Sequence, residues 1–516
     1  MAAFPPPRTT AVSFDTRKGE TTRIYQDFTT AHYMRCSFPN GDGTWTSVLH
    51  VPGEALVRWD PRRENIDVTV LSSRIDPHAA AGTTQRLLRW QGRVYFPHRG
   101  WFDTRSMKCV DGPRPEKELT WFAIRGETAF GVEWKKGTIS VGAWDFASGH
   151  VRDVCDIQDS QVHNVNLSAS GKVIAVNTYG VFHRFDAESG ALEMCKVLPT
   201  DGVGVVDCLC RIDKERLLGT PFITQRFWEV NLRTGDGMDC GRAAPGAGEI
   251  LQVWKLGGKI YMAAYTGGEL MEYDPRRHPH YPENPRVVAS PPHAMRPVAA
   301  ATDGRHIFYA CSAPYGNLGS VVTRYDTKTG LASYRVNPLP EQQIRSLYYD
   351  RSSGNLLCGT TMHSDCQSCP PASDECYLAC LDAETLEVRQ QIAAPKGTEV
   401  ASVVGAMRTG EVLCTFTGSQ GLRWCSVKPG HLELPPEDKI KSFAEGVHQI
   451  VAAGRPGLFV LRLSDRVELW DMRRSQCVKT LLQGINKRFY VYRVVVQERS
   501  VYVVTPRHVI VLEDVL

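Results

Sequence analysis

The 516-residue sequence lacks a long apolar run and lacks a strong excess of charge of either sign. No segment approaches the roughly 18 to 20 consecutive apolar residues that a transmembrane helix needs. The first twenty residues, MAAFPPPRTTAVSFDTRKGE, hold three successive prolines where a secretory signal would have an apolar centre. We therefore expect a cytoplasmic protein without a membrane segment, provided that the chain is the full translation product. The net charge of +4 gives no reason to expect nucleic acid as a partner.

The common catalytic motifs are also missing. The sequence has no glycine-rich phosphate loop opening a helix, no nucleophile elbow, no His-Glu-x-x-His pair and no calcium loop. Glycine-rich pieces such as DGVGVVD are typical of turns between strands. These absences are compatible with a binding protein, or with an enzyme whose site is assembled from residues that lie far apart in the sequence.

Cysteine, in contrast, is plentiful, with 16 residues spread along the chain. Many lie inside apolar, strand-like runs, such as Cys208 and Cys210 in VVDCLCRI and Cys311 in IFYACS. In a chain large enough to form a core, cysteines in such runs behave as small buried hydrophobic residues. We expect them to be reduced.

One pattern recurs along almost the whole chain: an apolar or aromatic pair, an Asp, a turn with Thr, Ser or Gly, and a second strand. AWDFASGHVRDV, RFDAESGALEM and RYDTKTGLASYRV are examples. The Asp side chain accepts hydrogen bonds from turn amides and Gly supplies a positive φ, so the pattern predicts a hairpin. The anchoring residues, 41 to 56 positions apart, are Asp15, Asp60, Asp103, Asp145, Asp186, Asn231, Asp274, Asp326, Asp382, Lys428, Asp471 and Asp514.

Two further strand-like runs lie between successive anchors, as in EILQVWKLGGKIYMAAYTGGELMEYD. Each period therefore holds four short strands and no convincing amphipathic helix. Four strands in about 40 to 45 residues is the size of one propeller blade. The sequence predicts an all-β fold, a β-propeller of four-stranded antiparallel blades extending over residues 1–516.

The anchors delimit eleven blade-like repeats, more than the four to eight usual in one ring. Two rings, one very large ring, or some units that are not full blades (residues 85–112 are short) would each accommodate this number; we favour two rings. We also expect the N-terminal strand 20–26 to complete the last repeat, 490–516, by pairing near Thr21–Tyr25 with the strand near His508–Glu513.

The segment ELWDMRRSQCVKTL resembles the Trp-Asp repeat family, and AWDF at Trp144 and Asp145 is similar. Other repeats, such as GGKIYMAAYTGGELMEYDP, resemble the degenerate propellers of the quinoprotein and sugar-lyase type. Most repeats lack the Gly-His pair and many lack Trp. The resemblance therefore implies the architecture, and no single family's function follows from it.

The interval from Asp326 to Asp382 is 56 residues long, against about 43 for most others, and the surplus contains a Cys/His-rich insertion at 358–380. His363, Cys366, Cys369 and Cys376 offer a Cys-x-x-Cys pair, a third Cys and a His, which together would complete a tetrahedral zinc site. With no ligand position left open, the zinc would be structural. A disulfide-tied loop and unpaired surface cysteines are the alternatives.

The other long interval, from Asp274 to Asp326, contains PRRHPHYPENPRVVASPPHAMRP. Its histidines, His278, His280 and His293, lie among prolines and arginines. Such a loop on a rigid scaffold can line a ligand site, but a proline-rich surface connection is the stronger interpretation.

The first strand of a blade faces the central channel, so polar residues in apparent first strands are candidates for a site. The possible catalytic residues are His163, Tyr265, Arg296 and Tyr315, and the possible ligand-binding residues are Gln252, His293 and Arg345. A His or Tyr base with an Arg on a substrate carboxylate would suit β-elimination from a uronic acid sugar, as the resemblance to sugar-lyase propellers also implies. Hydrogen bonding between blades is the alternative role.

The sequence is compatible with two main hypotheses. The first is a non-enzymatic propeller that binds a protein or carbohydrate on one face, stiffened by the zinc loop. The second is a carbohydrate-active enzyme, specifically a polysaccharide lyase that acts on acidic glycans. A quinone-dependent redox propeller is a third possibility, without a distinctive cysteine signature here. Convergence of His163, a Tyr and an Arg in one open pocket would favour the enzyme.

Overall fold

The computed structural model describes residues 10–15, 20–26, 33–50, 54–60, 62, 66–72, 88–97, 99–135, 138–158, 162–177, 181–197, 206–222, 224–246, 248–443, 446–484, 493–505 and 508–516. Within these residues every regular element is a strand, except for two single 3₁₀ turns, η1 (Asp365–Gln367) and η2 (Glu437–Lys439). No helix in the described ranges is long and apolar enough to cross a membrane. The chain divides into two compact units, one containing Pro7–Gly202 and the other Val203–Leu516.

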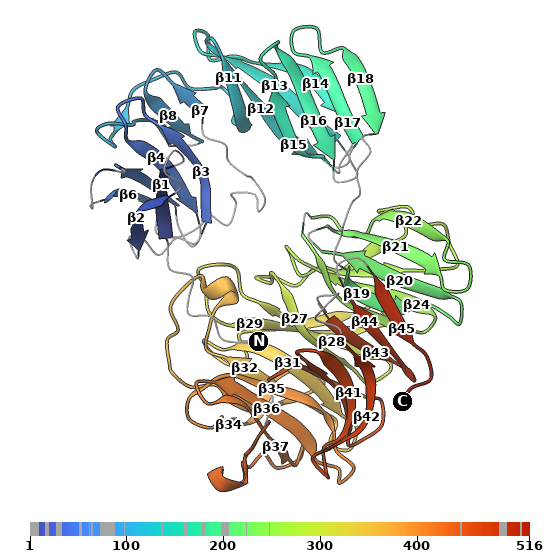
Figure 1. Cartoon of the computed structure of the whole chain (residues 1–516). Coiled ribbons are helices and arrows are strands. Elements are labelled where there is room, and N and C mark those ends of the chain that lie inside the picture. The colour runs from blue at the N-terminus through green and yellow to red at the C-terminus, as the bar shows by residue number, and fades with distance from the viewer. Residues whose placement is uncertain are drawn as a thin grey trace. The chain divides into compact units, whose positions relative to one another are not determined.

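The larger unit consists of seven antiparallel sheets that follow one another along the chain (Figure 1). The strands of the first four sheets are β19 Val206–Arg211, β20 Arg216–Pro221, β21 Arg226–Asn231 and β22 Gly237–Arg242; β23 Ile250–Leu256, β24 Lys259–Ala264, β25 Leu270–Tyr273 and β26 Arg286–Ala289; β27 Pro297–Thr302, β28 His306–Ser312, β29 Ser320–Asp326 and β30 Ala332–Val336; β31 Gln343–Asp350, β32 Asn355–Thr361, β33 Tyr377–Asp382 and β34 Val388–Ala393.

The strands of its last three sheets are β35 Thr398–Ala406, β36 Val412–Gly418, β37 Gly421–Val427 and β38 Lys441–Ser442; β39 Val447–Ala452, β40 Leu458–Leu463, β41 Arg466–Asp471 and β42 Gln476–Gln483; β43 Arg493–Gln497, β44 Ser500–Val504 and β45 Val509–Leu512. The seventh sheet has three strands among the described residues, and the others have four. A single bridge between Thr361 and Val400 links the fourth and fifth sheets.

The first strands of these seven sheets contact one another in chain order, and β43 also contacts β19. The contacts therefore run round a ring of seven sheets. At the seam, Arg493 Nη2 lies 3.4 Å from Asp207 Oδ1, and Gln497 exchanges hydrogen bonds with the β19 backbone at Leu209 O and Arg211 N, both at 2.6 Å.

The smaller unit holds four four-stranded sheets and a hairpin. Its strands are β1 Thr10–Asp15 and β2 Glu20–Gln26; β3 Tyr33–Pro39, β4 Trp45–His50, β5 Glu54–Trp59 and β6 Ile66–Ser72; β7 Leu88–Trp90, β8 Arg93–Phe96, β9 Gly100–Asp103 and β10 Cys109–Val110; β11 Thr120–Arg125, β12 Thr128–Lys135, β13 Thr138–Asp145 and β14 Val151–Ile157; β15 Val162–Leu167, β16 Lys172–Asn177, β17 Val181–Asp186 and β18 Leu192–Val197. These sheets also pack face to face in chain order, through shared apolar clusters.

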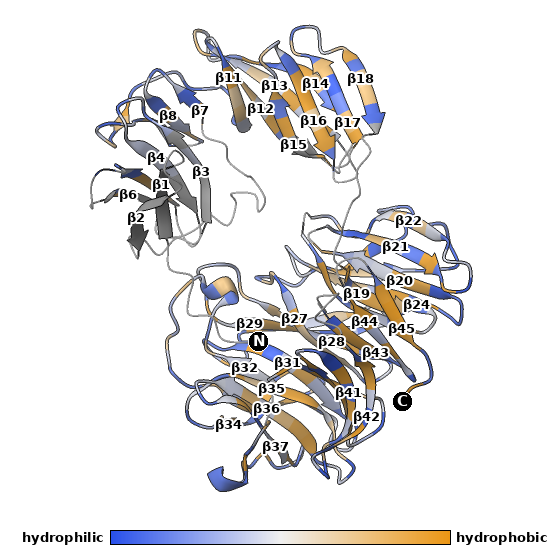
Figure 2. Ribbon diagram, viewed as in Figure 1, coloured by the Kyte–Doolittle hydropathy of each residue, from blue (hydrophilic) through white to orange (hydrophobic). Residues whose placement is uncertain are grey.

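Middle strands form the core because their residues are apolar on both faces (Figure 2). Six of the seven residues of β28 (HIFYACS) are buried, whereas four of the five residues of the outer strand β30 are exposed. A continuous apolar run is what a strand covered on both sides requires. Apolar side chains from neighbouring sheets, such as Phe308 with Leu356 and Phe227 with Met262, fill the interfaces.

The predicted all-β fold of four-stranded antiparallel blades is confirmed, with ten four-stranded sheets and the three-stranded last one. Even the short segment 85–112 forms a complete sheet, β7–β10. The anchoring residues end the third strand and open the turn to the fourth: Asp326, for example, ends β29 and accepts hydrogen bonds from the amides of Lys328 and Thr329.

The predicted strand pairing at the chain ends is not among the pairings of the described strands. β2 pairs with β1, and β45 pairs with β44. In the larger unit, the side chains of Arg493 and Gln497 join the seventh sheet to β19.

Candidate functional site

Several of the residues predicted as candidates come together at one end of the larger unit. Antiparallel strands alternate in direction, so the loop before a first strand and the loop between second and third strands lie at the same end of a sheet. These loops in the second, third and fourth sheets carry Glu249, Tyr265, Arg296, Tyr315 and Asp365. With Arg345 of β31 they form what we call the Tyr–Arg cluster.

Arg296 is the centre of the Tyr–Arg cluster. Its guanidinium carbon lies 3.9 Å from the centroid of the Tyr265 ring. Its Nε donates to Asp365 Oδ2 at 3.0 Å and its Nη2 to Tyr315 Oη at 3.3 Å. Nη1 lies 3.6 Å from Glu249 Oε2, and both carboxylates are buried. The charge of Arg296 is therefore already matched within the protein.

The two tyrosines are fixed against each other. Their hydroxyl oxygens are 3.0 Å apart. A Cβ at position 248 would lie 2.6 Å from the Tyr265 ring, so Gly248 lets the ring pack directly against the backbone. Burial raises the pKa of both Tyr265 and Tyr315. Both hydroxyls are consequently protonated at neutral pH, and they serve as hydrogen-bond donors rather than bases.

Arg345 differs from Arg296. Its side chain is only partly exposed, yet no hydrogen bond or ion pair joins its guanidinium to any residue in the described ranges. Burial lowers the pKa of Arg345, while the carboxylate of Asp365 acts in the opposite direction. An arginine nevertheless keeps its charge at neutral pH. The Tyr–Arg cluster thus contains one cation whose charge lacks a direct acceptor.

A β-bulge places Arg345. In the ladder, Ile344 pairs with Thr360 and Ser346 with Gly359, so Arg345 is skipped. The same irregularity occurs near the start of six of the seven first strands, where the skipped residues are Asp207, Leu251, Val298, Arg345, Glu399 and His448. A bulge leaves one residue outside the ladder and turns its side chain. The larger unit therefore presents a ring of such residues at the end where its first strands begin.

The four predicted zinc ligands do not meet in this structure. The buried Cys376 thiol donates to the carbonyls of Thr398 and Glu399 at 3.3 and 3.1 Å, and burial raises its pKa to about 11. Cys366 is exposed, with its sulfur 3.8 Å from Tyr315 Oη. No group of three or more His, Cys, Asp or Glu side chains within the described ranges is arranged to hold a metal ion. A donating thiol is not a thiolate ligand, so this arrangement does not fit zinc, which stays a prediction.

Two buried serines make the hydrogen bonds that organise the insertion. Ser364 Oγ accepts from Cys369 N at 2.9 Å and donates to Cys369 O at 3.0 Å. Ser368 Oγ accepts from Gly316 N at 2.9 Å, which ties the insertion to the loop that carries Tyr315. These contacts fix η1 and place Asp365 beside Arg296.

The remaining candidates are elsewhere. Gln252 lies partly exposed in β23, and His293 is exposed in the loop before β27 with a positive φ of 56°. His163 belongs to β15 of the smaller unit, where it is the residue skipped by that strand's bulge; its side chain lies outside the described residues. The structure therefore brings Tyr265, Arg296, Tyr315 and Arg345 together without a histidine.

Asp365 and Glu249 were missed because nothing in their local sequence marks them. Glu249 has a positional signal: it directly precedes a first strand, as Arg296 does. Asp365 stands between His363 and Cys366 in the sequence, and this segment was interpreted as a zinc site, in which Asp365 had no role. The fifteen cysteines whose side chains the structure describes form no disulfide with one another.

Comparisons with known proteins assign no family. No protein-family model matches the chain, and no curated protein matches it. Among solved structures, hydrazine synthase of Kuenenia stuttgartiensis is 12% identical over 61% of this chain and 97% of that chain, with a TM-score of 0.45. The computationally designed protein Ika8 is 10% identical over 78% of this chain and 99% of that chain, with a TM-score of 0.29. Neither similarity bears on the site.

Proposed function

We propose that the larger unit is a non-enzymatic binding module that holds a carboxylate-bearing ligand, such as an acidic sugar, at Arg345 in the Tyr–Arg cluster. The observation that carries the proposal is the unmatched guanidinium of Arg345. A partly buried cation has lost hydration, and an anionic ligand would restore its hydrogen bonds.

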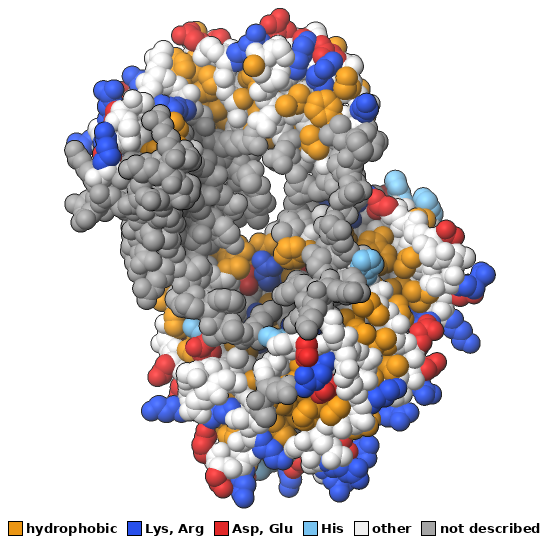
Figure 3. Space-filling view, viewed as in Figure 1, with side chains coloured by type: hydrophobic (Ala, Val, Ile, Leu, Met, Phe, Trp, Pro, Cys, Tyr) orange, Lys and Arg blue, Asp and Glu red, His pale blue; other side chains and the backbone are white. Residues whose placement is uncertain are grey.

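The rest of the Tyr–Arg cluster suits positioning. Asp365, Glu249 and the Tyr265 ring hold Arg296 from three sides, so its guanidinium is a fixed wall of the site. Tyr315 has a protonated hydroxyl beside this wall and can donate to a ligand oxygen. Charged residues of both signs are interspersed over the visible face of the larger unit (Figure 3), so selectivity for an anion has to come from this local arrangement.

A polysaccharide lyase is the second candidate, because two tyrosines and two arginines do converge. A lyase needs a base that removes a proton next to the sugar carboxylate. The raised pKa values of Tyr265 and Tyr315 oppose that role. His163, the other predicted base, belongs to a different compact unit.

The test is calorimetric titration of the full chain with trigalacturonate and with its methyl ester, which is uncharged. We expect the acid to bind and the ester to bind at least tenfold more weakly. Arg345→Met should weaken binding of the acid about tenfold or more, the effect of losing a charge-assisted hydrogen bond. Arg335→Met is the matched control, because this outer-strand arginine is half exposed and pairs with Glu387.

Equal affinity of the acid and the ester, or unchanged binding by the Arg345→Met variant, would overturn the proposal. The same incubation separates the two functions. A lyase releases an unsaturated uronate whose absorbance grows with time, and Tyr315→Phe would slow it. A binding module leaves trigalacturonate intact.

A further inference from the structure

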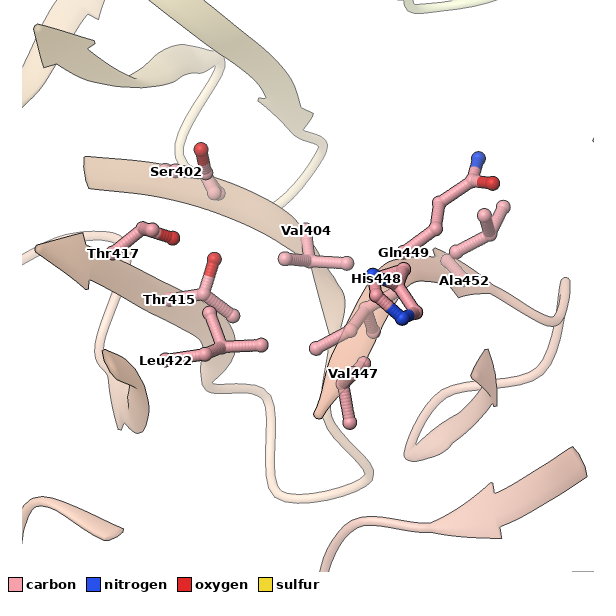
Figure 4. A pocket seen from close by; sticks show the side chains of 12 residues that line it. Ser402, Val404, Thr415, Thr417, Leu422, Val447, His448, Gln449 and Ala452 are labelled. Carbon is pink, nitrogen blue, oxygen red and sulfur yellow. The ribbon is translucent and has the colours of Figure 1, made fainter. Parts of the chain in front are cut away.

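A cavity whose lining shares no residue with the Tyr–Arg cluster lies between the fifth and sixth sheets of the larger unit (Figure 4). Its volume is about 430 Å³, and it is lined by residues of β35, β36, β37 and β39. This size falls toward the lower end of the range of small-molecule sites.

Two bulges account for the space. β35 skips Val404, which lies between Val403 and Gly405, and β39 skips His448. Each bulge bends its strand. Leu413, Trp424, Phe459 and Leu461, among others, fill part of the same interface, but they do not line the cavity.

One wall of the cavity is a row of hydroxyl groups. Ser402 pairs directly with Thr415 across the ladder between β35 and β36, so both side chains lie on one face. Thr417, two residues along β36, is on that face as well, and Figure 4 shows the three side chains together. Thr415 is only 7% exposed. Within the described part of the chain, none of the three hydroxyls has a hydrogen-bond partner.

Two other hydroxyls of this unit, those of Ser346 and Thr361, do have partners in the next sheet. Ser346 Oγ accepts from the amides of Gly359 and Val403, at 3.1 and 2.7 Å. Thr361 donates to the Glu399 carbonyl at 2.6 Å. Thr415 is buried, whereas Ser402 and Thr417 are partly exposed, and all three line the cavity. A ligand there can take the place of solvent as the partner of these hydroxyls.

The other walls define the ligand's charge and shape. Val404, Leu422, Val447 and Ile450 contribute aliphatic surface, and no Lys, Arg, Asp or Glu lines the cavity. Gln449 is already engaged, since its amide exchanges two 2.9 Å hydrogen bonds with the backbone of Val494. A charged ligand would lose hydration here without gaining a counter-charge.

His448 completes this side of the cavity. Its Nε2 lies 2.9 Å from Ser464 Oγ, and within the described residues Nδ1 has no hydrogen-bond partner. Burial lowers the pKa of His448, so the ring is neutral at neutral pH.

We propose that this cavity binds one uncharged, hydroxyl-rich small molecule of the size of a single sugar ring. The ligand's hydroxyls exchange hydrogen bonds with Ser402, Thr415 and Thr417, and its C–H face packs against Val404 and Leu422. This site is separate from the Tyr–Arg cluster and does not depend on the function proposed for that cluster.

The experiment uses the full chain and a panel of glucose, galactose, mannose and myo-inositol, followed by saturation-transfer NMR and calorimetry. We expect at least one member to bind. Thr415→Val keeps the shape but removes the hydroxyl, and it should weaken binding about fivefold, the effect of one net hydrogen bond. Ser333→Ala, on the exposed outer strand β30, is the control.

A second variant fills the cavity with a larger side chain, and its thermal transition shows whether lost binding results from lost folding. Val404→Phe should abolish binding while the thermal transition of the protein stays cooperative. Arg345→Met should leave binding of the neutral ligand unchanged, and in that background glucuronate should bind at least tenfold more weakly than the best neutral sugar. The proposal fails if no panel member binds, or if Thr415→Val and Val404→Phe both bind as the native protein does.

Discussion

The two long intervals in the sequence form two loops of the larger unit, and their different construction is instructive. Residues 362–376 connect β32 to β33 at the end where the first strands begin, and they place Asp365 in the Tyr–Arg cluster. Residues 274–285 follow the third strand β25 at the opposite end, with His280 exposed. Both loops contain residues typical of metal sites, and in both the hydrogen bonds that organise the loop come from other side chains.

Small polar side chains hold both loops. In 274–285 a single residue, Asn284, is 3% exposed, accepts from Asp274 N at 2.8 Å, and donates to the carbonyls of Asp274, Arg277 and His278. In 362–376 the corresponding hydrogen bonds are made by two residues, Ser364 and Ser368. Cys and His attract attention in a sequence because their chemistry is specific, whereas a buried Asn or Ser that closes a loop has no sequence signature.

The largest effect should come from Asn284→Ala. Removing a buried side chain that makes four hydrogen bonds should lower the free energy of unfolding by about 3 kcal/mol, because the loop carbonyls lose their donor. Urea unfolding measures this, and hydrogen exchange should show lost protection across 274–285. His280→Ala, at an exposed position, is the matched control. A change below about 0.5 kcal/mol would show that Asn284 does not hold the loop.

Ser364→Ala should lower the free energy of unfolding by less, about 1 to 2 kcal/mol, because one hydroxyl with two backbone partners is lost.

Replacing Cys366 and Cys369 together with serine should leave the free energy of unfolding within about 0.5 kcal/mol of the native value if Ser364 and Ser368 fold the loop. Elemental analysis of the same proteins tests the zinc prediction. One zinc per chain, lost in the double cysteine variant together with stability, would mean that thiolates hold the insertion and would break the comparison.

The smallest expected effect is a loss of amide protection in 274–285 at low pH. The hydrogen bonds from Arg276 hold the pKa of Asp274 at about 2, below its usual 3.8. A lowered pKa stabilises the folded state above the unfolded value, and this contribution is lost as the pH falls through the folded one. Protection of amides in 274–285 should therefore decline from about pH 4 to about pH 2. Asp274→Asn should flatten that decline, and an unchanged pH profile would contradict the assignment.

The sequence allowed the repeat to be predicted because most of these turns need a side-chain acceptor, and Asp145, Asp326 and Asp382 occupy the same place in their sheets for that local reason. Tyr265, Arg296 and Arg345 could be proposed because first strands and their loops face a common axis. Their mutual contacts could not, since Arg296 reaches Asp365 across 69 positions. Nor could the cavity beside Ser402 and Thr415, which depends on where two strands bulge.

The recurring bulge near the start of the first strands has a consequence for how this protein can change. A residue skipped by the ladder contributes its side chain without a cross-strand partner, so replacing Leu251, Val298 or Glu399 leaves strand registration intact. Each of these sites can therefore vary independently of its neighbours and of the scaffold. A lineage of such proteins could acquire new ligand preferences through single substitutions at these positions, while the sheets that carry them stay the same.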